Sequence, residues 1–268
     1  MDTKFDYFEA FSRNLGFVSV SEQKKIQNTT VAIAGAGGAG SGTSMALARL
    51  GFGKFKIADL DYYEVANFNR QLGATMSSVG KDKTSVIERM IKDINPEAVV
   101  TRFDQGISPE NIDEFLDGVD VVVDALDFYC FKERMFLFPA ARKKGLWVFN
   151  SPPLGFGCAL LGFDPEGMTF EDYFGFTDDM EQERWVELLM AGLSPDQFLM
   201  QYLDKRHLDF EGKTLPSVGI GVFFLSAFVA TEIVKLISEK QTPIAVPKLL
   251  QFDAMLMQMK ITEKSMDD

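Results

Sequence analysis

The chain has 268 residues, of which 46% are hydrophobic and 25% are charged, and it carries a net charge of -12. This composition is ordinary for a globular protein with enough apolar residues for a full core. The negative charge argues against a nucleic-acid backbone as the main ligand.

The first half of the chain alternates between strand and helix patterns. Short apolar, β-branched runs predict strands at residues 29–34, 54–61, 98–104, 120–127 and 146–150. Between them, helical patterns follow the glycine turn as far as Gly51 and occupy residues 81–95, 108–119 and 131–145. Strands that alternate with helices at this spacing predict right-handed crossovers and a parallel sheet.

The second half has a different character. Residues 155–163 form a strand pattern, and residues 163–211 then carry 13 Asp and Glu against 3 Lys and Arg. Aromatic residues such as Phe170, Tyr173 and Trp185 make this segment too apolar for a disordered acidic tail, so we expect an ordered helical insertion. A long helix is expected over 217–238, and one or two closing strands over 248–262.

Three features of the chain bear on its cellular location. The most apolar stretch, Gly219–Ile237, contains Glu232 and Lys235 and therefore predicts a buried helix and no membrane partner. The N-terminal residues show no signal-peptide pattern. Cys130 and Cys158 are too few for a disulfide framework, which favours a reducing compartment. We expect a cytoplasmic protein.

These patterns predict an α/β fold: a doubly wound, mostly parallel, Rossmann-like sheet that antiparallel strands continue, with a helical acidic insertion over the site. We expect a single domain, with an N-terminal helical arm (1–28), a nucleotide-binding core (29–162), the acidic insertion (163–215), and a closing helix and strands (216–268).

A glycine turn follows the first predicted strand and opens a helix. Gly35, Gly37 and Gly40 form the pattern G-x-G-x-x-G, and Gly38 adds a further glycine. The free N–H groups and positive dipole end of such a helix favour phosphate. Asp59 ends the next strand, where a carboxylate can accept hydrogen bonds from ribose hydroxyls. The glycines could instead serve close helix–strand packing alone, and Asp59 could be a solvated strand end.

Three charged residues follow later strands on the same edge of the predicted sheet. Arg70 and Lys83 come after the second strand, and Asp127 ends the fourth. No G-K-[ST] follows the glycines, so a triphosphate would need its positive partners from elsewhere. Arg and Lys suit phosphate oxygens, and a carboxylate suits Mg²⁺. Each residue alone could be a solvated surface charge; their combination with the glycine turn predicts nucleotidyl transfer.

The sequence resembles the ThiF/MoeB/ubiquitin-activating superfamily of ATP-dependent adenylating enzymes. The matching segments lie in the family's order over most of the chain, and "NFNRQ" followed at this interval by a lysine is more specific to the superfamily than the glycine motif. They are "FSRN", "VAIAGAGGAGSGTSMALARLGFGKFKIADLD", "NFNRQ", "VGKDK", "INP", "VVVDALD", "LPSVGIGVFFLSAFVATEIVKLI" and "KLLQFDAM".

The resemblance implies a homodimer that binds ATP and Mg²⁺ and adenylates a carboxylate, typically that of a small ubiquitin-like or sulfur-carrier protein, or of a peptide. The four glycines would lie along the phosphates, with Asp59 at the ribose. Asn67, assisted by Asn69, would contact the phosphates together with the two cations. Asp127 would bind the metal, and Arg13 of "FSRN" would reach the partner subunit's ATP.

The sequence also departs from the family pattern. It lacks the paired C-x-x-C motifs of many members, so no zinc is expected. The acidic insertion contains no cysteine where many relatives have a reactive one, and Phe128 replaces the usual Asn after the metal-binding Asp. Of the two cysteines, Cys130 is the better candidate for a nucleophile than Cys158, because it lies at a predicted helix start. The favoured interpretation of Cys130 is nevertheless an inert core cysteine. We interpret His207 as solvated.

The sequence therefore predicts an ATP-dependent adenylyltransferase that forms an acyl-adenylate and releases pyrophosphate. Two alternatives remain open at this point. The same glycines and Asp59 fit an NAD(P)-dependent oxidoreductase, and the chain could be a non-catalytic nucleotide-binding scaffold or the inactive half of a heterodimer. The Met-rich residues Met255, Met257 and Met259 are interpreted as one packed side of a closing strand.

Overall fold

A computed structural model describes residues 4–177, 180, 182–208 and 215–264. Its strands are β1 (Thr30–Ala34), β2 (Lys54–Ala58), β3 (Val99–Phe103), β4 (Val121–Asp124), β5 (Trp147–Asn150), β6 (Pro153–Leu154), β7 (Gly157–Phe163), β8 (Lys248–Asp253) and β9 (Gln258–Glu263). Its α-helices are α1 (Tyr7–Ala10), α2 (Val20–Asn28), α3 (Gly38–Leu50), α4 (Lys83–Ile94), α5 (Ile112–Phe115), α6 (Phe131–Lys143), α7 (Phe170–Phe174), α8 (Gln182–Leu193) and α9 (Gly219–Ser238). Short 3₁₀ helices are η1 (Ser12–Asn14), η2 (Val65–Asn67), η3 (Phe198–Gln201) and η4 (Lys205–His207).

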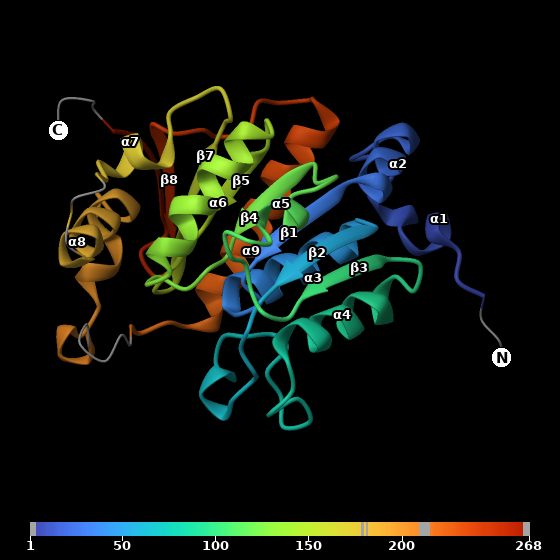
Figure 1. Cartoon of the computed structure of the whole chain (residues 1–268), viewed down its shortest axis with the longest axis horizontal. Helices are drawn as coiled ribbons and strands as arrows, with labels where there is room; N and C mark the ends of the chain where they lie inside the picture. Colours follow the sequence, from blue (N-terminus) through green and yellow to red (C-terminus); the bar gives the residue numbers. More distant parts are fainter. Residues whose placement is uncertain (1–3, 178–179, 181, 209–214, 265–268) are drawn as a thin grey trace.

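One sheet runs through the molecule in the order β3-β2-β1-β4-β5-β7-β8-β9, with β6 paired to β7 (Figure 1). The first five strands in this order are parallel. The remaining strands continue the sheet in antiparallel fashion. The strand order reverses between β1 and β4, which is where open parallel sheets bind ligands. The predicted fold class is confirmed.

Helices cover both faces of the sheet because its central strands are apolar on both sides. Val31 and Ile33 of β1 pack into one core with α3, α4 and α9. Ala32 and Ala34 of the same strand belong to a second core with α5 and α6. The alternation of side chains along a strand therefore divides β1 between two hydrophobic layers. This doubly covered arrangement fixes where the strand ends point.

Helix α9 is a core helix with a buried carboxylate. Within the described residues it is the one helix long and apolar enough to cross a membrane, but it packs against α3 and β7. Glu232 is buried, lies 2.5 Å from Lys235 Nζ and accepts a 2.7 Å hydrogen bond from the Ile244 N–H. The two charged residues of this helix, Glu232 and Lys235, thus have their partners within the protein.

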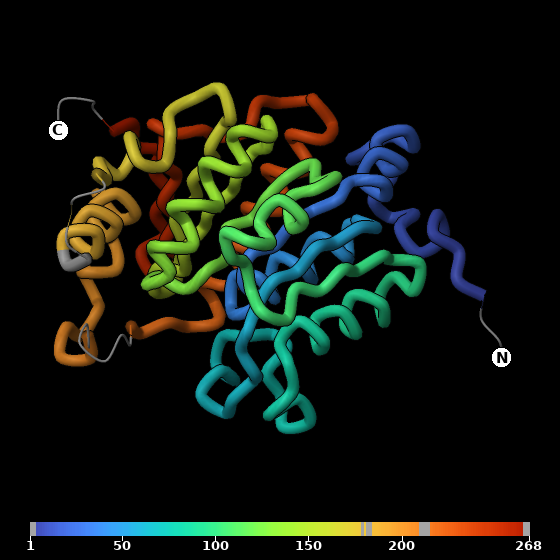
Figure 2. The backbone as a smooth tube through the Cα atoms, viewed as in Figure 1, coloured from blue at the N-terminus to red at the C-terminus, as the bar shows by residue number. Residues whose placement is uncertain are grey.

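The acidic insertion folds as helices at one end of the sheet. It contains α7, α8, η3 and η4, and Figure 2 shows it, coloured yellow to orange, at the opposite end of the molecule from the blue N-terminal helices. Phe170, Tyr173, Phe174 and Phe176 are buried and pack on one another. Aromatic packing gives this segment an ordered core despite its negative charge.

Three sequence-based details are wrong. The fourth strand ends at Asp124, so Asp127 lies in the following loop, because the partner strand β1 ends at Ala34 and the chain turns at Gly35, which has φ of +101°. Helix α5 begins at Ile112, after a turn, and not at residue 108 as the helical pattern predicted. The methionines are not packed: Met255 and Met257 lie in the β8–β9 turn, and Met259 is exposed on β9, a strand whose residues are nearly all exposed.

Candidate functional site

A cavity of about 730 Å³ opens at the carboxyl ends of the parallel strands. The glycine turn, Asp59, Arg70, Lys83 and Asp127 all line it. Residues from four separate segments of the first half of the chain therefore meet in one space, as the strand order requires at the point where it reverses. The two predicted cations face the same cavity as the glycine turn.

Backbone packing dictates two of the glycines in the turn. Gly35 has φ of +101°, and a Cβ there would lie 2.2 Å from the Ala125 carbonyl oxygen. A Cβ on Gly40 would lie 1.8 Å from the Gly35 carbonyl oxygen. Gly37 and Gly38, at the start of α3, line the cavity together with Gly35, but a Cβ on either would meet no atom closer than 3.2 Å. The packing interpretation thus explains Gly35 and Gly40, whereas Gly37 and Gly38 present free backbone to a ligand.

Asp59 holds the glycine turn against the end of β2. Its carboxylate accepts a 2.6 Å hydrogen bond from the Ala36 N–H and a 2.8 Å bond from the Asp61 N–H. Each carboxylate oxygen can accept a further hydrogen bond, so this side chain can still receive ribose hydroxyls from the cavity. Asp59 is therefore a structural support for the turn as well as a candidate ligand.

Lys83 and Arg70 both line the cavity and belong to the segment that follows β2. Lys83 begins α4; its residue is only 6% exposed, and its Nζ lies 2.9 Å from Asp61 Oδ2. Arg70 donates from Nη1 to the Ala66 carbonyl and to Asn69 Oδ1, and the rest of its guanidinium fork is available to the cavity. A polyanion in this cavity would meet both cations.

The two asparagines of the same motif have local partners. Asn67 Oδ1 accepts from the Glu64 N–H at 3.0 Å and closes the η2 turn. Asn69 Nδ2 donates to the Ser217 carbonyl at 2.8 Å, which joins this loop to the segment before α9. Neither belongs to the residues that line the cavity in this structure. Their contact with a nucleotide stays a prediction.

Gln71, the last residue of "NFNRQ", is a candidate that the sequence reasoning did not single out. It lines the cavity and is 8% exposed, and its Oε1 is buried with no hydrogen-bond partner among the described residues. Its amide also lies 3.6 Å from the position of a Cβ on Gly37. A buried polar atom without a partner at a cavity wall favours a ligand there. The signal in the sequence that could have identified Gln71 is its place in the motif "NFNRQ".

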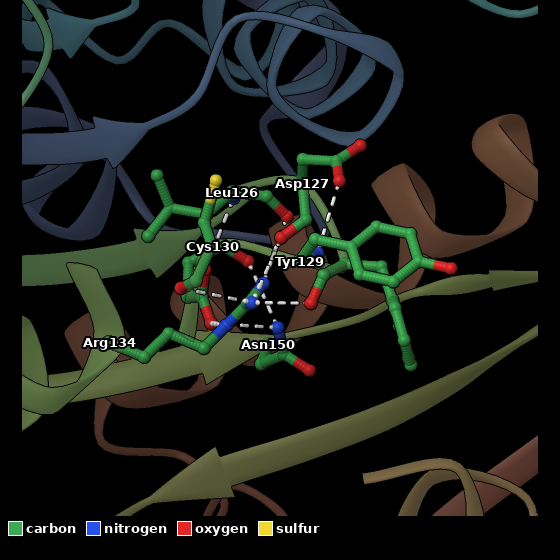
Figure 3. Close-up of polar contacts among 8 residues, drawn as sticks. Leu126, Asp127, Tyr129, Cys130, Arg134 and Asn150 are labelled. Atoms are coloured by element: carbon green, nitrogen blue, oxygen red, sulfur yellow. Dashed lines mark hydrogen bonds and ion pairs between the residues drawn. The ribbon is translucent and has the colours of Figure 1, made fainter. Parts of the chain in front are cut away.

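Asp127 is held in place by a buried arginine (Figure 3). Arg134 Nε donates to Asp124 Oδ2 at 2.7 Å, and its Nη1 donates to the Asp127 carbonyl at 2.9 Å. Its Nη2 donates to the Leu126 carbonyl at 2.9 Å, and Asn150 Nδ2 adds a 3.0 Å bond to Asp124. The Asp127 side chain remains exposed and accepts from the Tyr129 N–H at 3.1 Å. Arg134 thus fixes the backbone from which this carboxylate projects.

The residues present fit a magnesium ion that is shared with a nucleotide. No group of three or more His, Cys, Asp or Glu side chains within the described residues is arranged to hold a metal by itself. Mg²⁺ usually binds through one or two carboxylates together with substrate phosphates and waters. Asp127, exposed in a cavity that also holds the glycine turn, can supply one such carboxylate.

The cysteines and the single histidine do not form a nucleophilic site. Burial, reinforced by the Glu133 carboxylate, raises the pKa of the Cys130 thiol to about 11, although Cys130 lines the cavity at the start of α6. Burial raises the pKa of Cys158 to about 12. His207 is exposed in η4. The interpretation of Cys130 as an unactivated thiol agrees with this environment.

Arg13 lies far from the cavity of its own chain. It is exposed in η1, and the next residue, Asn14, donates to the Leu50 carbonyl at the last residue of α3. The glycine turn is at the first residue of α3, and a 13-residue helix spans roughly 18 Å. Arg13 could therefore contact this type of site only in a neighbouring subunit.

Two curated proteins are similar to this chain over about half of its length. The tRNA threonylcarbamoyladenosine dehydratase of Bacillus subtilis is 40% identical over 123 residues, which cover 46% of this chain and 48% of that protein. The sulfur carrier protein ThiS adenylyltransferase of Bacillus subtilis is 36% identical over 131 residues, 48% of this chain and 38% of that protein. The matches thus span about half or less of these relatives.

A solved structure shares the fold over almost the whole chain. The crystal structure of E. coli MccB with ATP superimposes with a TM-score of 0.71 at 20% identity and covers 98% of this chain and 72% of that one. The family model described as the ThiF family matches residues 11–268. The resemblance found in the sequence is confirmed: this chain belongs to the ThiF family.

Proposed function

We propose that this protein is an ATP-dependent adenylyltransferase that activates a substrate carboxylate. A carboxylate oxygen attacks the α-phosphorus of ATP, the bond from that phosphorus to the diphosphate oxygen breaks, acyl-adenylate forms and pyrophosphate leaves. Bound Mg²⁺ would supply charge neutralisation at the phosphates. The role of the chain is to hold the nucleotide on the glycine turn and to place Arg70 and Lys83 beside the charge that develops.

A single observation carries this proposal: Arg70 and Lys83 line the same cavity as the glycine turn and Asp127. Hydride transfer builds up no negative charge on phosphate, so two cations beside the phosphate-binding turn favour a triphosphate over the oxidoreductase alternative. Cys130 faces the cavity as a thiol whose pKa burial raises to about 11. We infer that the activated acyl group passes to an external nucleophile.

The substrate class proposed here is a small protein or peptide that ends in a free carboxylate. Some relatives are named as sulfur-carrier adenylyltransferases and others as tRNA-modifying dehydratases. The net charge of -12, with 13 acidic residues in residues 163–211, repels a polyanionic tRNA backbone. This charge supports a protein or peptide partner for this chain.

We also propose a homodimer in which Arg13 completes the partner's nucleotide site. Its position, remote from the cavity of its own chain, supports this assignment. The outer face of α9 carries the exposed apolar side chains Ile220 and Phe223, and Phe17, in the loop before α2, is 88% exposed. Exposed apolar groups of this size are typical of surfaces that another subunit covers.

Calorimetric titration with the ATP analogue AMP-CPP in the presence of Mg²⁺, and separately with NAD⁺, tests the nucleotide assignment. We expect AMP-CPP to bind, and Lys83→Ala to weaken it by roughly tenfold or more because a charge-assisted contact to phosphate is lost. Lys81→Ala is the matched control, because Lys81 is exposed two residues away and outside the cavity lining. Tighter binding of NAD⁺ than of AMP-CPP would contradict the proposal.

Exchange of labelled pyrophosphate into ATP separates an enzyme from a nucleotide-holding scaffold. We expect exchange that depends on an added mixture of peptides with free C-termini and that is lost in Asp127→Asn. An AMP-CPP-binding protein that shows no exchange with any carboxylate, and whose biological output survives Asp127→Asn, would instead be the scaffold or the inactive half of a heterodimer.

A further inference from the structure

The cavity that holds the glycine turn continues into a second, apolar end. Beyond Asp127 its walls come from the β6–β7 hairpin and from the acidic insertion. The apolar side chains at this end include Leu154, Phe156, Leu189, Leu193, Met200 and Leu203. The segment with the highest negative charge in the sequence thus turns apolar side chains toward the site.

The insertion wall is attached to the antiparallel end of the sheet on both sides of η3. Before η3, Asp196 accepts hydrogen bonds from Gln251, Lys260 and Thr262. After η3, the Tyr202 hydroxyl donates to Asp253 at 2.5 Å and accepts from the Phe156 N–H at 3.1 Å. Two anchors that flank the lining residues Leu199 and Met200 make this wall a fixed surface.

The charges at this end leave little for a polar substrate group to bind. The basic residues that line the whole cavity within the described chain are Arg70, Lys83 and Arg134. Arg70 lies beside Gly38 of the glycine turn, Lys83 is paired with Asp61, and Arg134 is buried in its pair with Asp124. Asp204 also lines the cavity and is paired with Arg206, and Glu133 lines it from the first turn of α6. An apolar group is therefore the best match for this surface.

We propose that the apolar end receives a bulky apolar group next to the carboxylate that is adenylated. This inference rests on the proposed adenylation. The substrate would be a peptide or protein whose last residue is large and apolar, or a branched-chain carboxylic acid, and its tail would not end in glycine. The chemistry that recognises it is the burial of one branched or aromatic group in a preformed pocket.

Acylsulfamoyl adenosines test this proposal, because they join an adenosine to a chosen acyl group without a reactive phosphate. Their dissociation constants are measured with N-acetyl-leucyl, N-acetyl-glycyl, N-acetyl-lysyl and 4-methylpentanoyl groups, and with unacylated 5′-O-sulfamoyladenosine. We expect the leucyl compound to bind more tightly than the glycyl compound by roughly tenfold to a hundredfold, as for burial of one branched side chain. The 4-methylpentanoyl compound distinguishes a free branched-chain acid from the end of a peptide. If the substrate is a peptide, the N-acetyl-leucyl compound should bind more tightly than the 4-methylpentanoyl compound.

A pair of variants locates the effect. Met200→Gln, at a half-buried lining position, should reduce the leucyl preference by roughly fivefold because it places an amide in the apolar wall. Gln201→Ala, at the exposed neighbouring residue outside the lining, should leave it unchanged. Unaltered affinity for 5′-O-sulfamoyladenosine shows that each variant is folded.

The outcomes separate this inference from the function on which it rests. If no adenosine compound binds, the adenylation proposal itself fails. If unacylated 5′-O-sulfamoyladenosine binds but the glycyl or lysyl compound is as tight as the leucyl compound, the nucleotide site stands and the apolar-substrate inference is overturned. A leucyl preference that Met200→Gln does not change would place the acyl group elsewhere and overturn it as well.

Discussion

Among single residues, Arg134 supports the loop that carries the proposed metal-binding carboxylate, because it donates hydrogen bonds to Asp124 and to the carbonyls of Leu126 and Asp127. It is 4% exposed and its ion pair with Asp124 is fully enclosed. Removing one partner of such a pair leaves an uncompensated buried charge, which costs about 3–5 kcal/mol of folding free energy. Arg134→Ala should therefore lower the free energy of unfolding by that amount, measured by urea denaturation.

A matched control for this change lies two residues earlier in the same helix. Lys132 is exposed on α6, and Lys132→Ala should change stability by less than about 0.5 kcal/mol. A similarly small effect of Arg134→Ala would mean that the loop keeps its shape without the arginine. In that case Asp127 would not depend on the hydrogen bonds drawn in Figure 3.

The Cys130 thiol gives a prediction about pH. Burial, with the Glu133 carboxylate adding to it, raises the thiol pKa to about 11, so the reactive thiolate forms only as the pH rises toward that value. At pH 8 about one thiol in a thousand would be ionised, and alkylation by iodoacetamide should be roughly two-hundredfold slower than for an unperturbed cysteine. Mass spectrometry of the Cys130 peptide measures the rate. Fast labelling at pH 8 would reopen the question of a covalent intermediate.

Within the β1–turn–α3 element, two glycines of the same motif should behave differently. Gly40→Ala would place a Cβ 1.8 Å from the Gly35 carbonyl, so we expect a loss of about 1–3 kcal/mol or more in the free energy of unfolding. At Gly37 the nearest atom is the Gln71 amide at 3.6 Å, so Gly37→Ala should cost little stability yet weaken AMP-CPP binding. Equal losses of stability in both variants would show that the motif serves packing alone.

The elements that the sequence predicted well are those whose signals are local. The glycine turn, its strand and its helix are adjacent in the chain, and the structure has α3 closed by Gly51 in the left-handed conformation. The role of Arg134 was not predicted, because its partner Asp124 belongs to a different element and the interaction depends on burial. The apolar lining of the insertion was hidden for the same reason: Met200 and Leu203 have no periodicity that marks which side faces the cavity.

At the scale of the whole molecule, Arg13 lies at the opposite end of the sheet from the charged residues of the cavity. Arg70, Lys83 and Asp127 lie at the carboxyl ends of the strands, whereas Arg13 lies beyond the far end of α3. If the proposed dimer forms, each nucleotide site combines the cavity of one chain with the N-terminal arm of the other. Arg13→Ala and Lys83→Ala homodimers should then both lose pyrophosphate exchange, since every site lacks one cation.

Mixing the two inactive variants provides the decisive measurement. In a mixed dimer, the cavity of the Arg13→Ala chain keeps its own Lys83 and receives Arg13 from the Lys83→Ala chain, so one of its two sites is complete. Random exchange of equal amounts makes half of the dimers mixed, and half of their sites intact, which restores about a quarter of the wild-type exchange. Mixing Lys83→Ala with Asp127→Asn is the control, and it should restore nothing. A complete site needs Lys83 and Asp127 from the same chain, and in this mixed dimer each of the two cavities lacks one of them. Exchange that stays at zero after subunits have demonstrably mixed would exclude the contribution of Arg13 across the interface, and full activity of Arg13→Ala alone would exclude any role for it.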